Sequence, residues 1–276
     1  MSFTYTRRYT GPLQGVVLDW AGTTVDFGCL APAGAFMEAF RQAGVEITLE
    51  QARGPMGMAK WHHIQAVTRM PAVAAAWTAT HGRGPTDADV DRLYEIFLPL
   101  QVGVVERHAD VIPGAVAAVA AMRERGLKIG STTGYPRPVM EVVQRVAASQ
   151  GYAPDLVVCA GETPAGRPGP AMALKCVIEL GISPVEACVK IGDTVVDVEE
   201  GLNAGMWTIA LVDTGNEVGV PLPEWTALPE GRREALRRPA ADRLRRAGAH
   251  YVVGSLAEAV PLLDAIEARL ARGEKP

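Results

Sequence analysis

The chain has 276 residues, of which 48% are hydrophobic and 21% are charged, and its formal net charge is −4. This length predicts two domains, and this composition is that of a folded protein. The chain has no basic stripe and no run of about 20 apolar residues, so we expect neither a nucleic-acid partner nor a membrane span.

The cysteines and the N-terminus indicate the compartment. No C-x-x-C pair occurs, and the chain is too long and too poor in cysteine for a disulfide scaffold, so we expect free thiols in a reducing compartment. The first ten residues have no apolar stretch behind their arginines, so no signal peptide is expected. The cytoplasm is therefore the expected location. The cysteines are Cys29, Cys159, Cys176 and Cys188.

Short apolar runs alternate with helical patterns along much of the chain. Strands are predicted at 15–19, 127–133, 156–160, 187–191, 207–212 and 250–253. Helices are predicted between Pro113 and Gly126 and at 136–150, 170–180, 196–204 and 256–272. This alternation predicts an α/β fold with a Rossmann-like, mostly parallel sheet.

Residues 29–106 differ from the rest of the chain, because they show helical spacing and little strand character. Phe36 with Phe40 and Ile96 with Leu100 are examples of that spacing. We predict an all-helical domain at 29–106, inserted into an α/β core formed by 1–28 and 107–276. Ligands of parallel sheets bind at the carboxyl ends of the strands, and the insertion leaves from that edge, so it could close over the site as a cap.

Polar residues follow several of the predicted strands. Asp19 ends the first strand, Thr133 ends the second, and Asp193 and Asp197 follow the strand at 187–191. Arg167 precedes a predicted helix and adds a fixed positive charge. Clustered carboxylates bind Mg²⁺, and an aspartate nucleophile with a metal ion, a hydroxyl and a cation can transfer a phosphoryl group.

Four motifs in this order resemble those of the haloacid dehalogenase superfamily. They are Leu-Asp19-Trp-Ala21-Gly-Thr-Thr-Val-Asp, Ser-Thr-Thr133-Gly, Arg167-Pro-x-Pro and Gly-Asp193-x-x-x-Asp197. The resemblance implies that Asp19 accepts the phosphoryl group and that Thr133 and Arg167 bind its oxygens. It also implies that Mg²⁺ is bound by Asp19, Asp193 and the backbone carbonyl of Ala21, with Asp197 supporting the metal site.

Ala21 departs from the pattern of most phosphatases in this superfamily, which carry aspartate two residues after the nucleophile. That aspartate protonates a departing alkoxide, and its loss should cost roughly 10²–10⁴ in rate. A leaving group that needs no proton at this position would explain alanine. A carbon leaving group whose electron pair passes into a protonated imine is one such group.

The predicted cap offers a lysine for that imine. Lys60 lies in Met56-Gly57-Met58-Ala59-Lys60-Trp61-His62-His63, where apolar neighbours would lower its pKa. Together with Ala21, this segment resembles the phosphonoacetaldehyde hydrolase family. The resemblance implies a Schiff base on Lys60 with Met56, Gly57 and His63 nearby, Cys29 and Tyr135 lining the closed site, and a homodimer that pairs through the cap.

Simpler interpretations of these residues stay open at this point. Lys60 could be a surface charge, Cys29 a small core residue, and Arg167 the partner of Glu162 in a loop salt bridge. Adjacent helical residues point about 100° apart, so only one of His62 and His63 can face a site.

Two other functions are also compatible with the motifs: a phosphomonoesterase of small metabolites, and a non-catalytic phospholigand-binding protein.

Seven arginines between 232 and 246 lie among acidic residues and are interpreted as a solvated helical face, with an anion-binding patch as the alternative.

Overall fold

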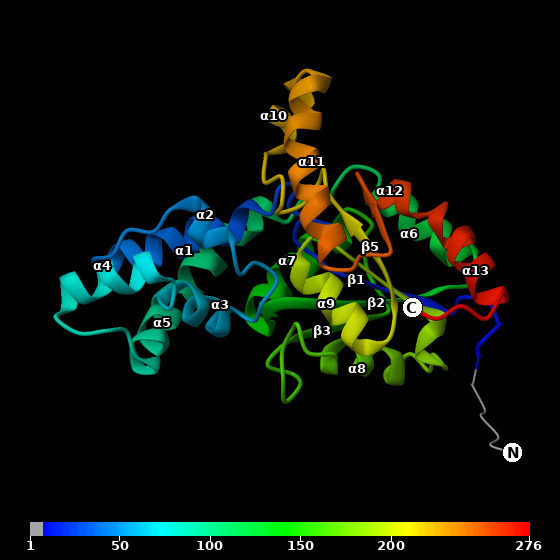
Figure 1. The fold of residues 1–276 in the computed structure, drawn as a ribbon, viewed down its shortest axis with the longest axis horizontal. Helices are drawn as coiled ribbons and strands as arrows, with labels where there is room; N and C mark the ends of the chain where they lie inside the picture. The colour runs from blue at the N-terminus through cyan, green and yellow to red at the C-terminus, as the bar shows by residue number, and fades with distance from the viewer. Residues whose placement is uncertain (1–7) are drawn as a thin grey trace, which may run out of the picture.

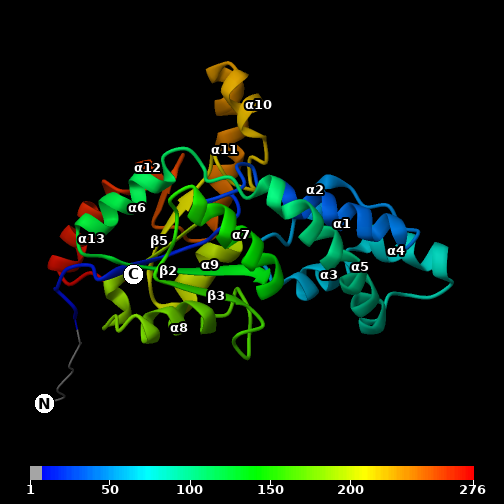
Figure 2. The same cartoon turned by 180° about the vertical axis from the view of Figure 1, so that it is seen from behind.

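A six-stranded sheet lies at the centre of the protein (Figures 1 and 2). The computed structural model describes residues 8–276, and residues 1–7, on which much of the signal-peptide expectation rests, lie outside the described part. All neighbouring strands are parallel, in the order β3-β2-β1-β4-β5-β6, so the predicted fold class is confirmed. The strands are β1 (Gly15–Leu18), β2 (Lys128–Pro136), β3 (Leu156–Ala160), β4 (Cys188–Gly192), β5 (Trp207–Leu211) and β6 (Tyr251–Val253).

Helices cover both faces of the sheet, and this explains why its inner strands are apolar throughout. Val16 and Val17 of β1 are both fully buried, but they point to opposite faces and join different hydrophobic clusters. One face packs against α6 (Ala115–Glu124), α7 (Arg137–Ser149), α12 (Leu256–Ala259) and α13 (Leu262–Ala271). The other packs against α8 (Ala171–Glu179), α9 (Val195–Ala204) and α11 (Glu230–Arg246). Two 3₁₀ turns are η1 (Glu106–His108) and η2 (Val185–Ala187).

Five helices between β1 and β2 lie together at one end of the sheet (Figures 1 and 2). They enclose a hydrophobic cluster of their own, in which the rings of Phe36 and Phe97 stack with centroids 4.3 Å apart. Four of them bring apolar side chains at three- or four-residue spacing to this cluster, and α2 contributes Ala52. The five are α1 (Leu30–Gln42), α2 (Leu49–Arg53), α3 (Lys60–Thr68), α4 (Pro71–His81) and α5 (Asp87–Val105).

Two elements differ from those predicted. The helix predicted at 256–272 is divided into α12 and α13, because Pro261 has no N–H to donate and its ring cannot fit within a continuous helix. Strand β2 continues past Thr133 to Pro136, with a shift of its register against β3 between these two residues.

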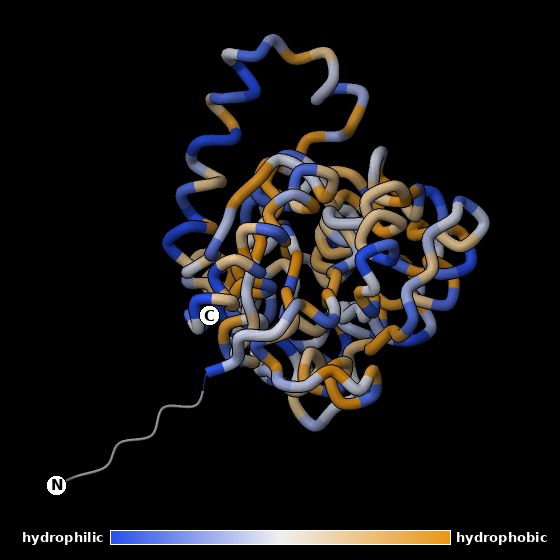
Figure 3. The backbone as a smooth tube through the Cα atoms, turned by 90° about the vertical axis from the view of Figure 1, so that its right-hand side faces the viewer, coloured by the Kyte–Doolittle hydropathy of each residue, from blue (hydrophilic) through white to orange (hydrophobic). Residues whose placement is uncertain are grey.

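Helices α10 (Leu222–Ala227) and α11 project from the body of the protein (Figures 1 and 3). Arg237 of α11 donates two hydrogen bonds of 2.8 Å to Asp213, and Arg243 donates one of 2.5 Å to Glu217. The outer face of α11 is polar, as expected of a solvated helix. Among residues 8–276, no helix is both long enough and apolar enough to cross a membrane.

Candidate functional site

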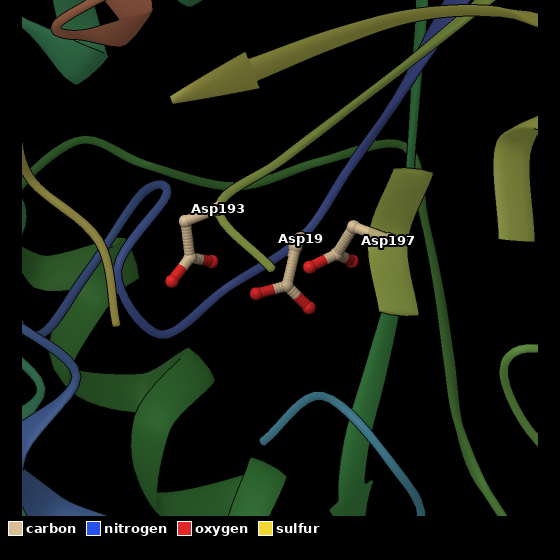
Figure 4. Close-up of side chains that lie close together, drawn as sticks. All are labelled: Asp19, Asp193 and Asp197. Carbon is tan, nitrogen blue, oxygen red and sulfur yellow. The ribbon is translucent and has the colours of Figure 1, made fainter. Parts of the chain in front are cut away.

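Three aspartates meet at the carboxyl-terminal edge of the sheet (Figure 4). Asp19 follows β1, Asp193 follows β4, and Asp197 lies in the first turn of α9. One carboxylate oxygen from each lies within 4.8 Å of the others, and all three residues are buried. Because β1 and β4 are parallel neighbours in the sheet, residues that follow them are brought together.

Asp193 is held by uncharged donors. The Thr23 hydroxyl donates to Oδ1 at 3.0 Å, and the backbone N–H of Asn216 donates to Oδ2 at 2.8 Å. Gly22 and Gly215 lie so close to the carboxylate that a Cβ at either position would overlap it. In the described part of the chain, no cationic side chain lies within 4.0 Å of Asp193. This carboxylate therefore lacks a counter-charge from the protein.

Two cations gather instead at Asp197. Arg167 forms ion pairs with Asp19 at 2.8 Å and with Asp197, and the Lys190 ammonium lies 3.1 Å from Asp197. Arg167 is buried, so its charge acts on these carboxylates in a medium that screens it poorly. It is placed to neutralise an anion that reaches Asp19.

The alternative interpretation of Arg167, as the partner of Glu162 in a loop salt bridge, is wrong. Glu162 pairs with Arg137 of α7 and accepts the backbone N–H of Cys159 at 3.0 Å. Arg167 turns the other way, toward the end of β1. The two residues are close in sequence, but their loop directs them to different sides.

Lys190 and Glu200 belong to the same buried network, although sequence analysis does not identify either. The Lys190 ammonium lies 2.9 Å from Glu200 and donates to the Thr132 hydroxyl at 2.9 Å. That hydroxyl donates in turn to Glu200 at 2.9 Å. A lysine inside an otherwise apolar strand is the one sequence signal that could have indicated it, because a buried charge requires partners.

Crowding raises the pKa of two of the three aspartates. Burial and the neighbouring Asp197 raise the pKa of Asp19 to about 6. Burial and the neighbouring Asp19 raise the pKa of Asp193 well above its usual range. A cation between them would relieve this repulsion, and oxygen donors suit a hard metal ion. The cluster could therefore hold a metal ion.

Asp197 differs from the other two, because all of its hydrogen-bonding capacity is used by protein groups. Oδ2 accepts the Thr194 hydroxyl at 2.6 Å and the Thr194 backbone N–H at 3.2 Å, in the capping box that begins α9. Oδ1 faces Arg167 and Lys190, and these two cations outweigh the effect of burial and lower the Asp197 pKa. This arrangement favours a supporting role over direct metal contact.

Lys60 begins α3 and points into the protein rather than to solvent, so it is not a surface charge. Its ammonium lies 4.9 Å from the centroid of the Tyr135 ring and 5.5 Å from that of Phe36. Burial lowers the Lys60 pKa to about 8. Lys60 can therefore supply a neutral amine near neutral pH.

One small cavity brings most of the predicted site residues together. Cys29 is a buried thiol on its wall whose pKa burial raises, and the Thr133 hydroxyl accepts the backbone N–H of Tyr135 at 3.1 Å. The cavity therefore joins the phosphoryl-binding motifs to the predicted Schiff-base lysine. It is lined by Asp19, Ala21, Cys29, Pro32, Met56, Gly57, Lys60, Thr133, Gly134, Tyr135, Arg167 and Thr194.

Of the two adjacent histidines, His63 points inward and His62 is exposed. The His63 ring stacks on Phe36 with centroids 3.8 Å apart, and Nε2 lies 2.9 Å from the carbonyl oxygen of Ala52. Burial and the nearby Lys60 lower the His63 pKa well below its usual range, so the ring is neutral. His63 does not line the cavity. It lies behind Phe36, which also contacts Lys60.

The segment before Lys60 approaches the core through glycines. A Cβ on Gly134 would lie 2.5 Å from the carbonyl oxygen of Met58, and a Cβ on Gly57 would lie 2.6 Å from the Thr194 hydroxyl. Gly57 also has a φ of +94°, which disfavours other residues. Only residues without a side chain allow the two backbones to approach this closely.

Together these groups can perform phosphoryl transfer and carbonyl chemistry in one cavity. Asp19 can attack phosphorus, because it lies beside Arg167 and the candidate metal ligands. Lys60 lines the same cavity and can attack an aldehyde there. Ala21 lines the cavity without a group that could donate a proton to a leaving oxygen.

Comparisons with known proteins agree with this chemistry. The family profile of haloacid dehalogenase-like hydrolases matches residues 13–205. A phosphonoacetaldehyde hydrolase of Nitratidesulfovibrio vulgaris is 49% identical over 274 residues, which cover 99% of this chain and 98% of that protein. One of Klebsiella pneumoniae is 51% identical, with 96% and 99% covered. The crystal structure of a phosphonoacetaldehyde hydrolase-like protein from Oleispira antarctica superposes with a TM-score of 0.97 at 41% identity and covers 100% of both chains.

Proposed function

Since the chain belongs to the haloacid dehalogenase-like hydrolases, we propose that it cleaves the carbon–phosphorus bond of phosphonoacetaldehyde and releases acetaldehyde and phosphate. The observation that carries this proposal is a buried lysine with a lowered pKa in the same cavity as the Asp19 carboxylate. The relatives of 49% and 51% identity bear the name of this activity.

The reaction begins at Lys60. Its neutral amine adds to the aldehyde carbon, and uptake of one proton from solvent with loss of water leaves a protonated imine. With a pKa of about 8, roughly one amine in ten is neutral at pH 7. For a lysine with the usual pKa, only about three amines in ten thousand would be neutral at the same pH. The lowered pKa therefore raises the concentration of the reactive form by roughly 300-fold.

Asp19 then attacks phosphorus. The carbon–phosphorus bond breaks, its electron pair passes into the protonated imine as an enamine, and the phosphoryl group is left on Asp19. Arg167, 2.8 Å from Asp19, and the Thr133 hydroxyl bind the phosphoryl oxygens. Water hydrolyses the aspartyl phosphate. The enamine takes up a proton at carbon, and hydrolysis of the imine frees Lys60 and acetaldehyde.

Mg²⁺ would be bound by Asp19, Asp193 and the backbone carbonyl of Ala21, with Asp197 in support. Bound there, it would neutralise charge on the phosphoryl oxygens. The lack of a protein counter-charge at Asp193 supports this assignment. Ala21 itself needs no acidic side chain in this reaction, because the leaving group is a carbon atom whose electrons the imine accepts.

Residues 29–106 form the cap. The part of the cap that surrounds Lys60 includes Met56, Gly57 and His63. Cys29 and Tyr135 line the closed site. We infer a homodimer that pairs through the cap, and a cytoplasmic location that fits four free cysteines.

The test is to incubate the protein with Mg²⁺ and phosphonoacetaldehyde and to measure acetaldehyde and phosphate together. Both are expected in equal amounts. Borohydride should stop the reaction and leave a reduced adduct on Lys60 that mass spectrometry locates. Lys60→Ala should abolish both products, whereas Lys175→Ala, which removes a partly exposed lysine paired with Glu179, should not.

Absence of both products from folded, Mg²⁺-loaded protein would refute the proposal. Release of phosphate from a phosphate ester by the Lys60→Ala variant would indicate a phosphomonoesterase. Binding of a phosphonate without any turnover would indicate a phospholigand-binding protein.

A further inference from the structure

The side chain of Arg53 joins three segments beside the cavity. Nη1 donates to the carbonyl oxygens of Gly28 at 3.1 Å and Asn216 at 3.0 Å, and Nη2 donates to that of Gly219 at 3.2 Å. The Asn216 side chain donates back to the Arg53 carbonyl oxygen at 3.4 Å. We propose that these contacts, the Arg53 junction, make Arg53 a positioning residue that holds the Lys60 segment against the aspartate cluster. The proposal rests on the proposed role of Lys60.

The position of Arg53 in the chain supports this role. It is the last residue of α2, and only the segment 54–59, which contacts the core through Gly57, separates it from Lys60. Asn216, on the other side of the junction, donates its backbone N–H to Asp193 at 2.8 Å. A short chain of contacts thus connects the candidate metal ligand to the candidate Schiff-base lysine.

Gly28 brings the third segment into the junction. It lies between β1 and α1, where the chain leaves the sheet for the five helices, and its N–H donates to the Thr214 carbonyl oxygen at 2.7 Å. One guanidinium at the end of α2 therefore contacts both the connection between the sheet and the five helices and the loop that supports Asp193. These are the places whose relative position sets the distance from Lys60 to Asp19.

The chemistry of the junction requires arginine. No carboxylate lies within 4.0 Å of Arg53 among residues 8–276, so its charge is directed to carbonyl dipoles. A planar fork with several N–H groups can reach three carbonyls at fixed angles, which the compact ammonium of lysine cannot do as well. Gly219, with a φ of +66°, leaves the space for this fork, because a Cβ there would overlap Nη1.

A groove on the outer side of the junction allows a chemical test. Arg53 lines it with Met56, Met58, Val196, Val218 and Arg243. Met56 also lines the cavity, so the groove and the cavity share a wall. A free guanidinium ion can enter such an open groove and replace a missing side chain.

The experiment compares Arg53→Ala with Arg243→Ala, which removes an arginine from the same groove that pairs with Glu217. With phosphonoacetaldehyde, Arg53→Ala is expected to lower kcat by about 10²-fold, because a misplacement of about 1 Å costs that much. KM should change much less. Millimolar guanidinium chloride should restore part of the rate, and sodium chloride at equal ionic strength should not. Arg243→Ala should stay within about twofold of the wild type.

Hydrogen exchange provides a readout that does not depend on substrate. In Arg53→Ala the amides of residues 54–60 should exchange faster, while those of β1 and β4 should not. If Arg53→Ala does not fold, Gly219→Ala, which displaces the guanidinium without removing it, should give the same pattern. Unchanged exchange at 54–60 and unchanged kcat would overturn the proposal. Faster exchange in a protein whose wild type leaves phosphonoacetaldehyde intact would support the junction and refute the proposed function instead.

Discussion

Gly134 offers a direct test of how closely the Lys60 segment must approach the core. A Cβ at this position would lie 2.5 Å from the Met58 carbonyl oxygen and 2.8 Å from that of Gly57. Both neighbours are backbone atoms, so neither can rotate away as a side chain could. Gly134 has no positive φ, and its own backbone would accept alanine without strain. Gly134→Ala therefore perturbs one contact and little else.

The size of the effect follows from this distance. The two backbones must separate by at least about 0.5 Å before the contact becomes tolerable, and overpacking of this kind costs roughly 1–3 kcal/mol. The clash is relieved when the Lys60 segment moves away from the core. The energetic cost therefore falls on the conformation in which this segment contacts Gly134. Each 1.4 kcal/mol is a factor of ten in a population. We expect kcat/KM to fall by roughly 5- to 150-fold.

The assay is the release of acetaldehyde from phosphonoacetaldehyde, followed through an NADH-coupled reduction. Gly34→Ala is the matched control, because a Cβ on Gly34 in α1 meets nothing within 4 Å. It should leave kcat/KM unchanged and stabilise the helix slightly. If Gly134→Ala cleaves its substrate as fast as the Gly34→Ala control, the close approach of Met58 is not needed for catalysis and the reasoning fails.

Three other predictions concern charge. Borohydride should trap the substrate on Lys60 about tenfold faster for each pH unit, up to a pH of about 8. The reason is that only the neutral amine attacks, and burial lowers the Lys60 pKa to about 8. A trapping rate that does not depend on pH below 8 would contradict this prediction. Asp193→Asn should weaken Mg²⁺ binding by at least about tenfold in a calorimetric titration. The control is Asp155→Asn, which removes a carboxylate that pairs with Arg123 and should leave Mg²⁺ binding unchanged. Equal Mg²⁺ affinities of the two variants would show that Asp193 does not bind the metal ion. Lys190→Met should lower the free energy of unfolding in urea by about 3–5 kcal/mol, because it leaves Arg167 as the only cation for the buried carboxylates of Asp19, Asp197 and Glu200 within this network. A loss no larger than that of Lys175→Met would show that the Lys190 ion pairs contribute little.

The elements of the fold are largely local properties of the sequence. Six strands and the helices between them lie close to their predicted positions, because apolar periodicity and Pro or Gly at the ends act over a few residues. The helix predicted at 256–272 is wrong in its middle, where Pro261 divides it. That signal is also local, and Pro261 alone could have indicated the break.

Part of the site is predictable for a similar reason. Residues that follow parallel strands share one edge of the sheet, so the strand pattern alone is enough to place Asp19, Thr133 and Asp193 together. Ala21 is informative only beside the motif of the superfamily that the sequence resembles, which usually carries aspartate at this position. Lys60 requires the resemblance to a known family, because nothing in its local pattern distinguishes a buried lysine from an exposed one.

The sequence by itself determined the order of the elements and the carboxylates at the strand ends. Only the tertiary structure decided which charges meet. Arg167 pairs with Asp19 and Asp197 instead of Glu162, and Lys190 with Glu200 completes the buried network. The physical reason is range: helices and strands form through neighbours in the chain, whereas an ion pair or a backbone contact depends on the distance between segments that only the packed fold brings together.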